Sequence, residues 1–343
     1  MTRIKALSLG SQKADTLVTH LQSYFVKALD TLSSEVGASK KFEAIEWFRN
    51  DGKSGGGVRY VATDSKLFNR ASVNISQVQY DNDPTKALAS ATALSTIIHP
   101  LNPYAPSIHM HVSWTEMKDG KGYWRMMADL NPSIFDMDDT MKFQECLQKS
   151  SNNYYSQASK QGDKYFFIPV LKRHRGVSHF YLEDFKTENK EADLHMAKAL
   201  VENVVDTYVK IIKNRILTHL DITQGDKDKQ LAYHTLYLFQ VLTLDRGTTS
   251  GLLVHNQNDI GILGSIPSHV DKALLLSWVD KMPKGQEKLL EAITNCLDED
   301  GRVEEEQKIK LAQTVRKFYQ NNPEALKLQA SGNVSVPTVQ NHK

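Results

Sequence analysis

Two runs of strand-like segments constrain the fold of this chain more than any other feature. The first run comprises residues 58–63, 68–80, 93–99, 107–117 and 122–130. The second run is predicted across residues 236–265, with a turn at residues 245–248. Strands that follow one another without intervening helices usually pair antiparallel in a single sheet. We therefore expect one large antiparallel sheet that contains both runs.

Two long amphipathic helices are predicted at residues 14–34 and 191–217. In both segments apolar residues recur at steps of three and four, which is the spacing of one helix face. Each apolar face needs a surface to cover, so we expect the two helices to lie on the sheet. Further helices are predicted at residues 138–157 and 285–329. The predicted fold class is α+β, a large antiparallel sheet flanked by helices on both faces.

Composition describes a chain that can bury a large core, with 343 residues of which 40% are hydrophobic. The net charge of +2 gives no general reason to expect nucleic acid or a membrane as a partner. No apolar run reaches the roughly 18 to 20 residues of a membrane span, so we expect a cytoplasmic protein. Two cysteines, Cys146 and Cys296, are too few for a disulfide framework. The predicted organisation is a single domain at 1–283, a helical extension at 284–330 and a mobile tail at 331–343.

The strand at residues 107–117 carries the most suggestive polar side chains. Because alternate residues of a strand face opposite sides, His109, His111 and Ser113 share one face and an apolar set shares the other. Three prolines between residues 100 and 106 restrict the corner that leads into this strand. The pattern favours one wall of a polar site, although the solvated face of a sheet would look the same.

Three further features allow two interpretations each. Asp129 ends a strand before a turn with Pro132, so it is a candidate general base or a turn cap. The basic residues 172–175 could bind an anion or form a solvated turn. Glycines at 52 and 55–57 favour a tight turn over a phosphate loop, because their order does not fit a Walker motif and no helix follows.

With these pieces in order, the chain resembles the oxygen-dependent coproporphyrinogen III oxidases over roughly residues 14–283. Several separated phrases carry the resemblance, and their order and spacing both hold. They are Trp47 and Arg49 before the glycines, ASVNISQV at 71–78, STIIHPLNPYAPSIHMHV at 95–112, Trp124 leading to DLNP at 129–132, His174, Arg175 and Gly176 leading to YLEDF, and LDRGTTSGL at 244–252.

The resemblance implies a fold, a reaction and a set of site residues. Members of the family have an antiparallel sheet flanked by helices, work as homodimers, and use molecular oxygen without an obligatory metal or organic cofactor. They oxidatively decarboxylate two propionates of coproporphyrinogen to vinyl groups, a step of heme biosynthesis. By matching positions, His109 is the proton donor and Asp129 the catalytic aspartate. The implied substrate-binding residues are Ser95, His99, His111, Val112, Ser113, Arg49 and Arg175.

This sequence departs from the family pattern at positions that contact the substrate. Ser113 stands where the family has an arginine expected to hold a propionate, and the bulkier residues 126–128 replace glycines. Because a buried carboxylate needs a cation, these changes favour a related, smaller carboxylic acid as substrate. Two alternatives stay open, a non-catalytic tetrapyrrole-binding paralogue and a metal-dependent oxidase. The second would hold iron or copper at His99, His109, His111 and Asp129.

Overall fold

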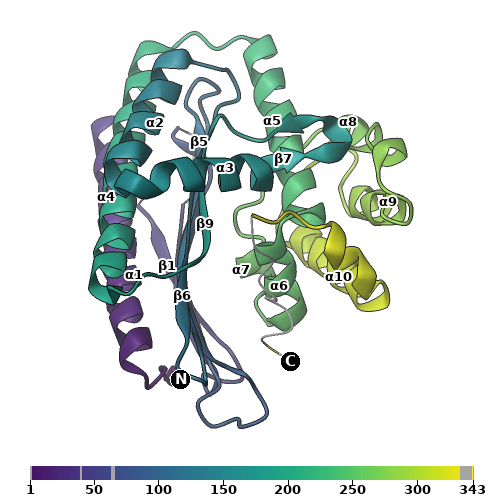
Figure 1. Cartoon of the computed structure of the whole chain (residues 1–343). Coiled ribbons are helices and arrows are strands. Elements are labelled where there is room, and N and C mark those ends of the chain that lie inside the picture. The colour runs from purple at the N-terminus through teal and green to yellow at the C-terminus, as the bar shows by residue number, and fades with distance from the viewer. Residues whose placement is uncertain (1, 39–40, 63–65, 256, 333–341, 343) are drawn as a thin grey trace.

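The computed structural model describes residues 2–38, 41–62, 66–255, 257–332 and 342. Its centre is a seven-stranded antiparallel sheet, seen nearly edge-on in Figure 1. The strand order is β1-β2-β3-β4-β5-β6-β9, so that sequential strands are neighbours until the last. The large antiparallel sheet is confirmed, and the two edge strands β1 and β9 are additions to it. The strands are β1 Glu43–Phe48, β2 Gly55–Ala62, β3 Phe68–Gln79, β4 Leu88–Pro100, β5 Ser107–Met117, β6 Gly122–Asn131 and β9 Ser178–Phe185.

Helices α1 (Leu9–Glu35) and α4 (Lys190–Thr218) cover one face of the sheet, as predicted for the two amphipathic helices. Their apolar sides pack on the core side of β5, which includes Met110 and Val112. Helix α2 (Met137–Ser151) lies beside α4. The single helix predicted at 138–157 is in fact two, because α3 (Tyr155–Phe166) starts after a short 3₁₀ turn.

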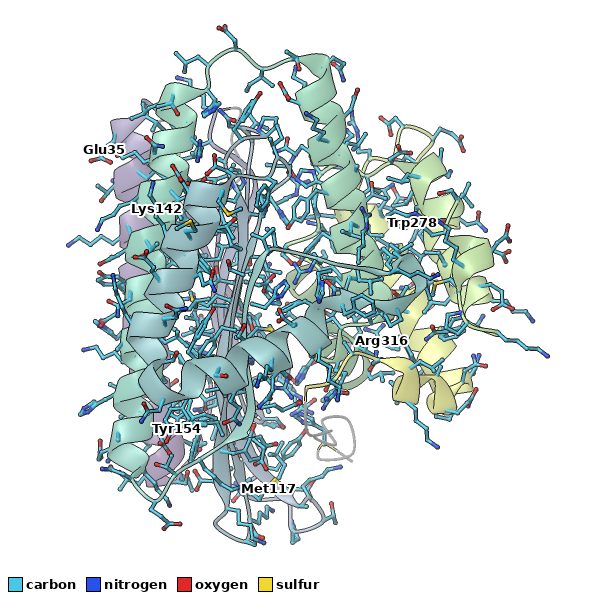
Figure 2. The ribbon with its side chains drawn as sticks, turned by 45° about the horizontal axis from the view of Figure 1, so that its top comes forward. Glu35, Met117, Lys142, Tyr154, Trp278 and Arg316 are labelled. Carbon is cyan, nitrogen blue, oxygen red and sulfur yellow. The ribbon has the colours of Figure 1, made fainter. Side chains whose placement is uncertain are left out.

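A second helical layer covers the opposite face, so helices flank the sheet on both sides. Figure 2 shows the two layers apart, with Glu35 at the end of α1 on one side and Trp278 on the other. This layer begins with α5 (Gln224–Thr243), α6 (Arg246–Val254) and α7 (Asp259–Ile262). It continues with α8 Lys272–Leu276, α9 Glu287–Asn295 and α10 Glu305–Asn321.

The prediction of a second strand run at 236–265 is therefore wrong. Every residue from 233 to 243 of α5 is buried, so the segment shows no one-sided apolar stripe. A helix that is buried all round cannot be told from a core strand by periodicity alone. The turn predicted at 245–248 is instead the start of α6, where the backbone N–H of Thr248 donates to the Asp245 carboxylate at 2.6 Å.

The C-terminal region continues the second layer. Helical structure at 285–329 is confirmed, and Leu289, Leu311 and Tyr319 pack in the same core as α5. The domain division at residue 283 stays a prediction. Of the tail predicted to be mobile, residues 333–341 and 343 lie outside the described residues. A small two-stranded sheet pairs β7 Phe167–Ile168 with β8 Arg173–His174.

Candidate functional site

A cavity of about 280 Å³ lies between the sheet and the second helical layer. The sheet contributes His109, His111, Ser113 and Arg125, while Asp245 and the short helices α6 and α7 close the other side. Its volume is at the lower edge of the roughly 300 to 1,000 Å³ common for small-molecule sites. The cavity thus has imidazole, carboxylate, guanidinium and hydroxyl groups around one space.

Strand alternation places the histidine wall as predicted. Met110 and Val112 are buried in the core under α1 and α4, and the alternate residues His109, His111 and Ser113 line the cavity. In the register of β4, β5 and β6, Ser95 faces His111 and Asp129 faces His109. The antiparallel pairing thus brings Ser95, His109, His111 and Ser113 together along one wall.

His111 is held as a neutral ring by two serines. Its Nδ1 shares a 2.7 Å hydrogen bond with Ser95 Oγ, and its Nε2 shares one of 2.9 Å with Ser113 Oγ. Burial, with a further contribution from the nearby Arg125, lowers the pKa of His111 to about 3. A neutral imidazole has one donor and one acceptor nitrogen, so this row supplies hydrogen bonds without charge.

His109 is fixed from behind by a buried ion pair. Its Nδ1 lies 3.2 Å from Asp129 Oδ1 and 3.1 Å from Arg175 Nη2, and the tautomer decides which of the two it hydrogen-bonds. Arg175 Nη2 also lies 3.1 Å from Asp129 Oδ2, to which the Asn131 side chain donates at 2.6 Å. Because Nδ1 is held at the back, the ring presents Nε2 to the cavity.

Asp129 does not itself reach the cavity wall. Its side chain is 0% exposed and is covered by Arg175. Burial acts against the carboxylate, but Arg175 and His109 outweigh that effect and hold the pKa of Asp129 below its usual value. The structure therefore places Asp129 as a partner of His109, whereas a substrate-facing base was expected.

Arg175 belongs to the same buried group and has no surface on the cavity. Its Nε donates to Gln240, and its guanidinium lies over the rings of Phe166 and Tyr237 at 5.0 and 5.3 Å. The basic run at 172–175 is thus divided, since its first three residues are exposed and only Arg175 turns inward. These four residues form no joint anion site, and Arg175 was expected to contact substrate directly.

The carboxylate that does line the cavity is Asp245, a residue for which sequence reasoning predicted only a turn. It caps α6, and the Tyr165 hydroxyl donates to its Oδ1 at 2.7 Å. Burial disfavours its charge, but the Tyr165 hydrogen bond, His109 and the cap together keep the pKa of Asp245 below the ordinary value. The signal available in the sequence was Asp245 three residues before Thr248, a spacing typical of a helix start.

Three expected binding residues lie elsewhere. Val112 is 0% exposed in the core under α1 and α4, so its side chain contacts no ligand. His99 is also fully buried, where Nδ1 bonds Ser107 Oγ at 2.9 Å and the ring packs on Tyr237. Arg49 stands outside the cavity wall, with its guanidinium over Tyr80 and Nη2 donating to the Tyr80 hydroxyl at 2.7 Å.

The metal alternative required His99, His109, His111 and Asp129 to converge. Within the described residues, no group of three or more His, Cys, Asp or Glu side chains is arranged to hold a metal ion. His111 instead engages its two serines, and His99 lies apart beneath α5.

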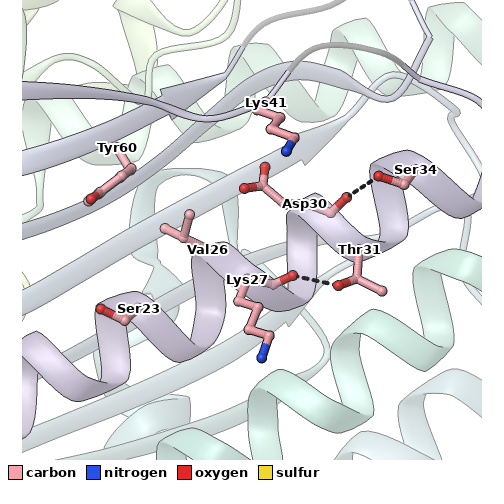
Figure 3. A pocket seen from close by; sticks show the side chains of 8 residues that line it. All are labelled: Ser23, Val26, Lys27, Asp30, Thr31, Ser34, Lys41 and Tyr60. Carbon is pink, nitrogen blue, oxygen red and sulfur yellow. Dashed lines mark hydrogen bonds between the residues drawn. The ribbon is translucent and has the colours of Figure 1, made fainter.

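Another hollow, of about 430 Å³, lies between α1 and the β2 side of the sheet (Figure 3). The hydroxyls of Thr31 and Ser34 donate back to backbone carbonyls of α1 at 2.9 and 3.0 Å. Among the described residues, no histidine lines it. These two hydroxyls thus serve the helix itself, and the cavity beside His109 is the stronger candidate site.

Across the described part of the chain, no helix is long and apolar enough to cross a membrane.

The chain matches the family model described as Coproporphyrinogen III oxidase over residues 13–295. An oxygen-dependent coproporphyrinogen-III oxidase of Rattus norvegicus, named as mitochondrial, is 29% identical over 282 residues, which are 74% of this chain and 61% of that protein. One of Drosophila melanogaster is 28% identical over 75% of this chain and 70% of its own length. One of Rickettsia rickettsii (strain Sheila Smith) is 28% identical over 74% of this chain and 94% of its own length.

The chain spans about three fifths of the length of the mammalian relatives that it matches. The family match, by contrast, extends over the whole sheet, most of α1 and the second helical layer as far as α9, so it includes most of the cavity wall. Together with the cavity residues of the DRGT and His109 phrases, this match establishes that the chain belongs to the coproporphyrinogen III oxidase family.

Proposed function

We propose that this protein oxidatively decarboxylates a propionate on a pyrrole ring, with molecular oxygen as the electron acceptor. The main observation in support of this reaction is that an ionised carboxylate, Asp245, and a positioned imidazole, His109, line the same cavity. In this reaction a propionate side chain, oxygen and one proton give a vinyl group, carbon dioxide and hydrogen peroxide. The substrate loses two electrons, and oxygen gains them.

The cavity residues suit the two proton transfers of such a reaction. Asp245 keeps its charge in a largely buried position and can accept a proton from the pyrrole N–H. His109 presents Nε2 to the cavity and can supply a proton to reduced oxygen. Asp129 and Arg175 act through His109 by holding its Nδ1. Family members carry out this chemistry without an obligatory metal or organic cofactor.

The first test uses coproporphyrinogen III, the compound in the names of the relatives, with chelator present throughout. We expect oxygen consumption with carbon dioxide and hydrogen peroxide formed in equal amounts, and none under nitrogen. A parallel reaction uses a pyrrole that bears a single propionate. Turnover of the single-propionate compound alone would identify a smaller substrate. Silence with both would contradict the proposal and favour a non-catalytic binding protein.

Iron or copper is then restored to the chelated protein. Activity that requires this addition, and that His111→Ala abolishes, would favour the metal-dependent alternative. Since His111 is engaged by Ser95 and Ser113, we expect no gain of activity on adding either metal.

We also propose that the protein is a homodimer, on the basis of its family membership, and that it is cytoplasmic, as expected from its sequence. Light scattering after size-exclusion chromatography should give about twice the 38.7 kDa chain mass at micromolar concentration. A single species at the chain mass would contradict the dimer. The mass measurement does not depend on activity, so it tests this proposal separately.

A further inference from the structure

Arg125 is the one permanent cation among the described residues that line the cavity. The other lining residue with a permanent charge is the carboxylate of Asp245. Burial lowers the pKa of His255 to about 3 and that of His342 to about 4, so these two lining histidines are neutral near pH 7, like His111. An anionic ligand that enters the cavity therefore meets one fixed positive group.

The position of Arg125 follows from the sheet register. On β6 it shares the cavity face with Asp129, four residues further on, and it pairs directly with Ser113 of β5. Four strand residues correspond to roughly 13 Å along the sheet, the offset between Arg125 and the residue paired with His109. The guanidinium is thus placed beyond His111, at the opposite end of the wall from His109.

The surroundings of Arg125 keep it charged and oriented. Its Nη2 lies 3.3 Å from Glu183 Oε1, and the same oxygen lies 3.1 Å from Arg246 Nη1. One buried carboxylate therefore serves two guanidinium groups. Burial opposes the charge of Arg125, but Tyr181 and Glu183 outweigh burial and raise its pKa. A carboxylate that enters the cavity would therefore meet a charged guanidinium.

We infer that Arg125 is the carboxylate-binding residue of the cavity and that the ligand presents a single carboxylate to this wall. The inference rests on the proposed function, because it assigns the recognition of that substrate. The side chain is 13% exposed, so the contact is largely shielded from water and stronger than a surface ion pair. Additional carboxylates of a larger substrate would have to lie at the mouth of the cavity, away from Asp245.

The test compares two ligands that differ only in charge, a pyrrole with one propionate and the same pyrrole with the propionamide. Wild-type protein should bind the acid roughly 10- to 150-fold more tightly in a calorimetric or NMR titration. Arg125→Met should remove this preference, so that both compounds bind alike, and Arg125→Lys should keep part of it. Arg302→Met is the matched control, because Arg302 is exposed, lies near Asp300 and is outside the cavity wall, and it should leave the ratio unchanged.

Binding is measured without turnover, so failures of the two proposals can be told apart. If Arg125→Met retains the preference for the acid, or if the wild-type protein shows none, the inference is overturned whatever the enzyme catalyses. If the acid preference depends on Arg125 but no hydrogen peroxide forms from any propionate, only the proposed reaction fails. Should Arg125→Met not fold, the loss of preference is read from Arg125→Gln instead, with Arg125→Lys expected to keep part of it.

Discussion

Arg175→Met is expected to lower the free energy of unfolding by about 3 to 5 kcal/mol at pH 7. The substitution leaves the fully buried Asp129 carboxylate without its guanidinium partner, and breaking one side of a buried pair carries this cost. Urea unfolding at equilibrium measures the change. Lys172→Met is the control, because Lys172 is exposed and close in sequence, and its effect should stay within about 0.5 kcal/mol.

The deficit of Arg175→Met should depend on pH. In the wild-type protein the folded pKa of Asp129 is lowered, so its contribution is present above the unfolded pKa of about 4 and is lost as pH falls through the folded value. Without Arg175, burial should raise that pKa, and the protonated carboxyl needs no cation. The difference between the two proteins should therefore be largest near neutral pH and shrink toward pH 4.

A double substitution separates loss of the pair from loss of packing. Arg175→Met with Asp129→Asn removes both charges, so the protein should be more stable than with Arg175→Met alone. A deficit that is the same at all pH values, and that the second substitution does not relieve, would contradict the role of charge. It would show instead that Arg175 stabilises the fold by packing on Phe166 and Tyr237.

The parts of the fold that could be predicted are those with one buried face. β5 alternates between core and cavity, and α1 and α4 each present an apolar side, so their periodicities were readable from the sequence. Helix α5 was not, because the second helical layer surrounds it and all of residues 233–243 are buried. Such burial results from contacts made by distant segments, which local spacing does not record.

Contacts between distant segments also explain why the sequence predicted only part of the candidate site. Alternation correctly grouped His109, His111 and Ser113, whereas the place of Arg125 on the β6 face of Asp129 became apparent only in the structure. Whether a residue on that face reaches the cavity depends on what covers it, and Arg175 covers Asp129. Asp245 reaches the cavity only because its segment is a helix start, which the strand prediction concealed. The error in α5 and α6 thus led to the misplacement of the cavity carboxylate.

Asp245→Asn is expected to reduce kcat by roughly 10²- to 10⁴-fold with whichever propionate substrate the wild-type protein converts. Asparagine keeps the size of the side chain and caps helices as well as aspartate, so α6 should remain in place. What is lost is the negative charge that accepts a proton. Because the pKa of Asp245 is below its ordinary value of about 4, the wild-type protein should show no loss of activity from this group between pH 5 and 8.

The chain offers a matched control in Asp271, which caps α8 by accepting the backbone N–H of Leu274 at 2.8 Å and lies outside the cavity wall. Asp271→Asn makes the same chemical change at another helix start, so kcat should stay within a factor of about two. Equal losses in the two variants would show that capping, and not proton transfer, explains the effect. A large loss of kcat confined to Asp245→Asn, with unchanged unfolding in urea, would instead assign the proton-accepting role to the Asp245 carboxylate. Asp129 cannot fill this role, because it lies behind His109 and does not reach the cavity.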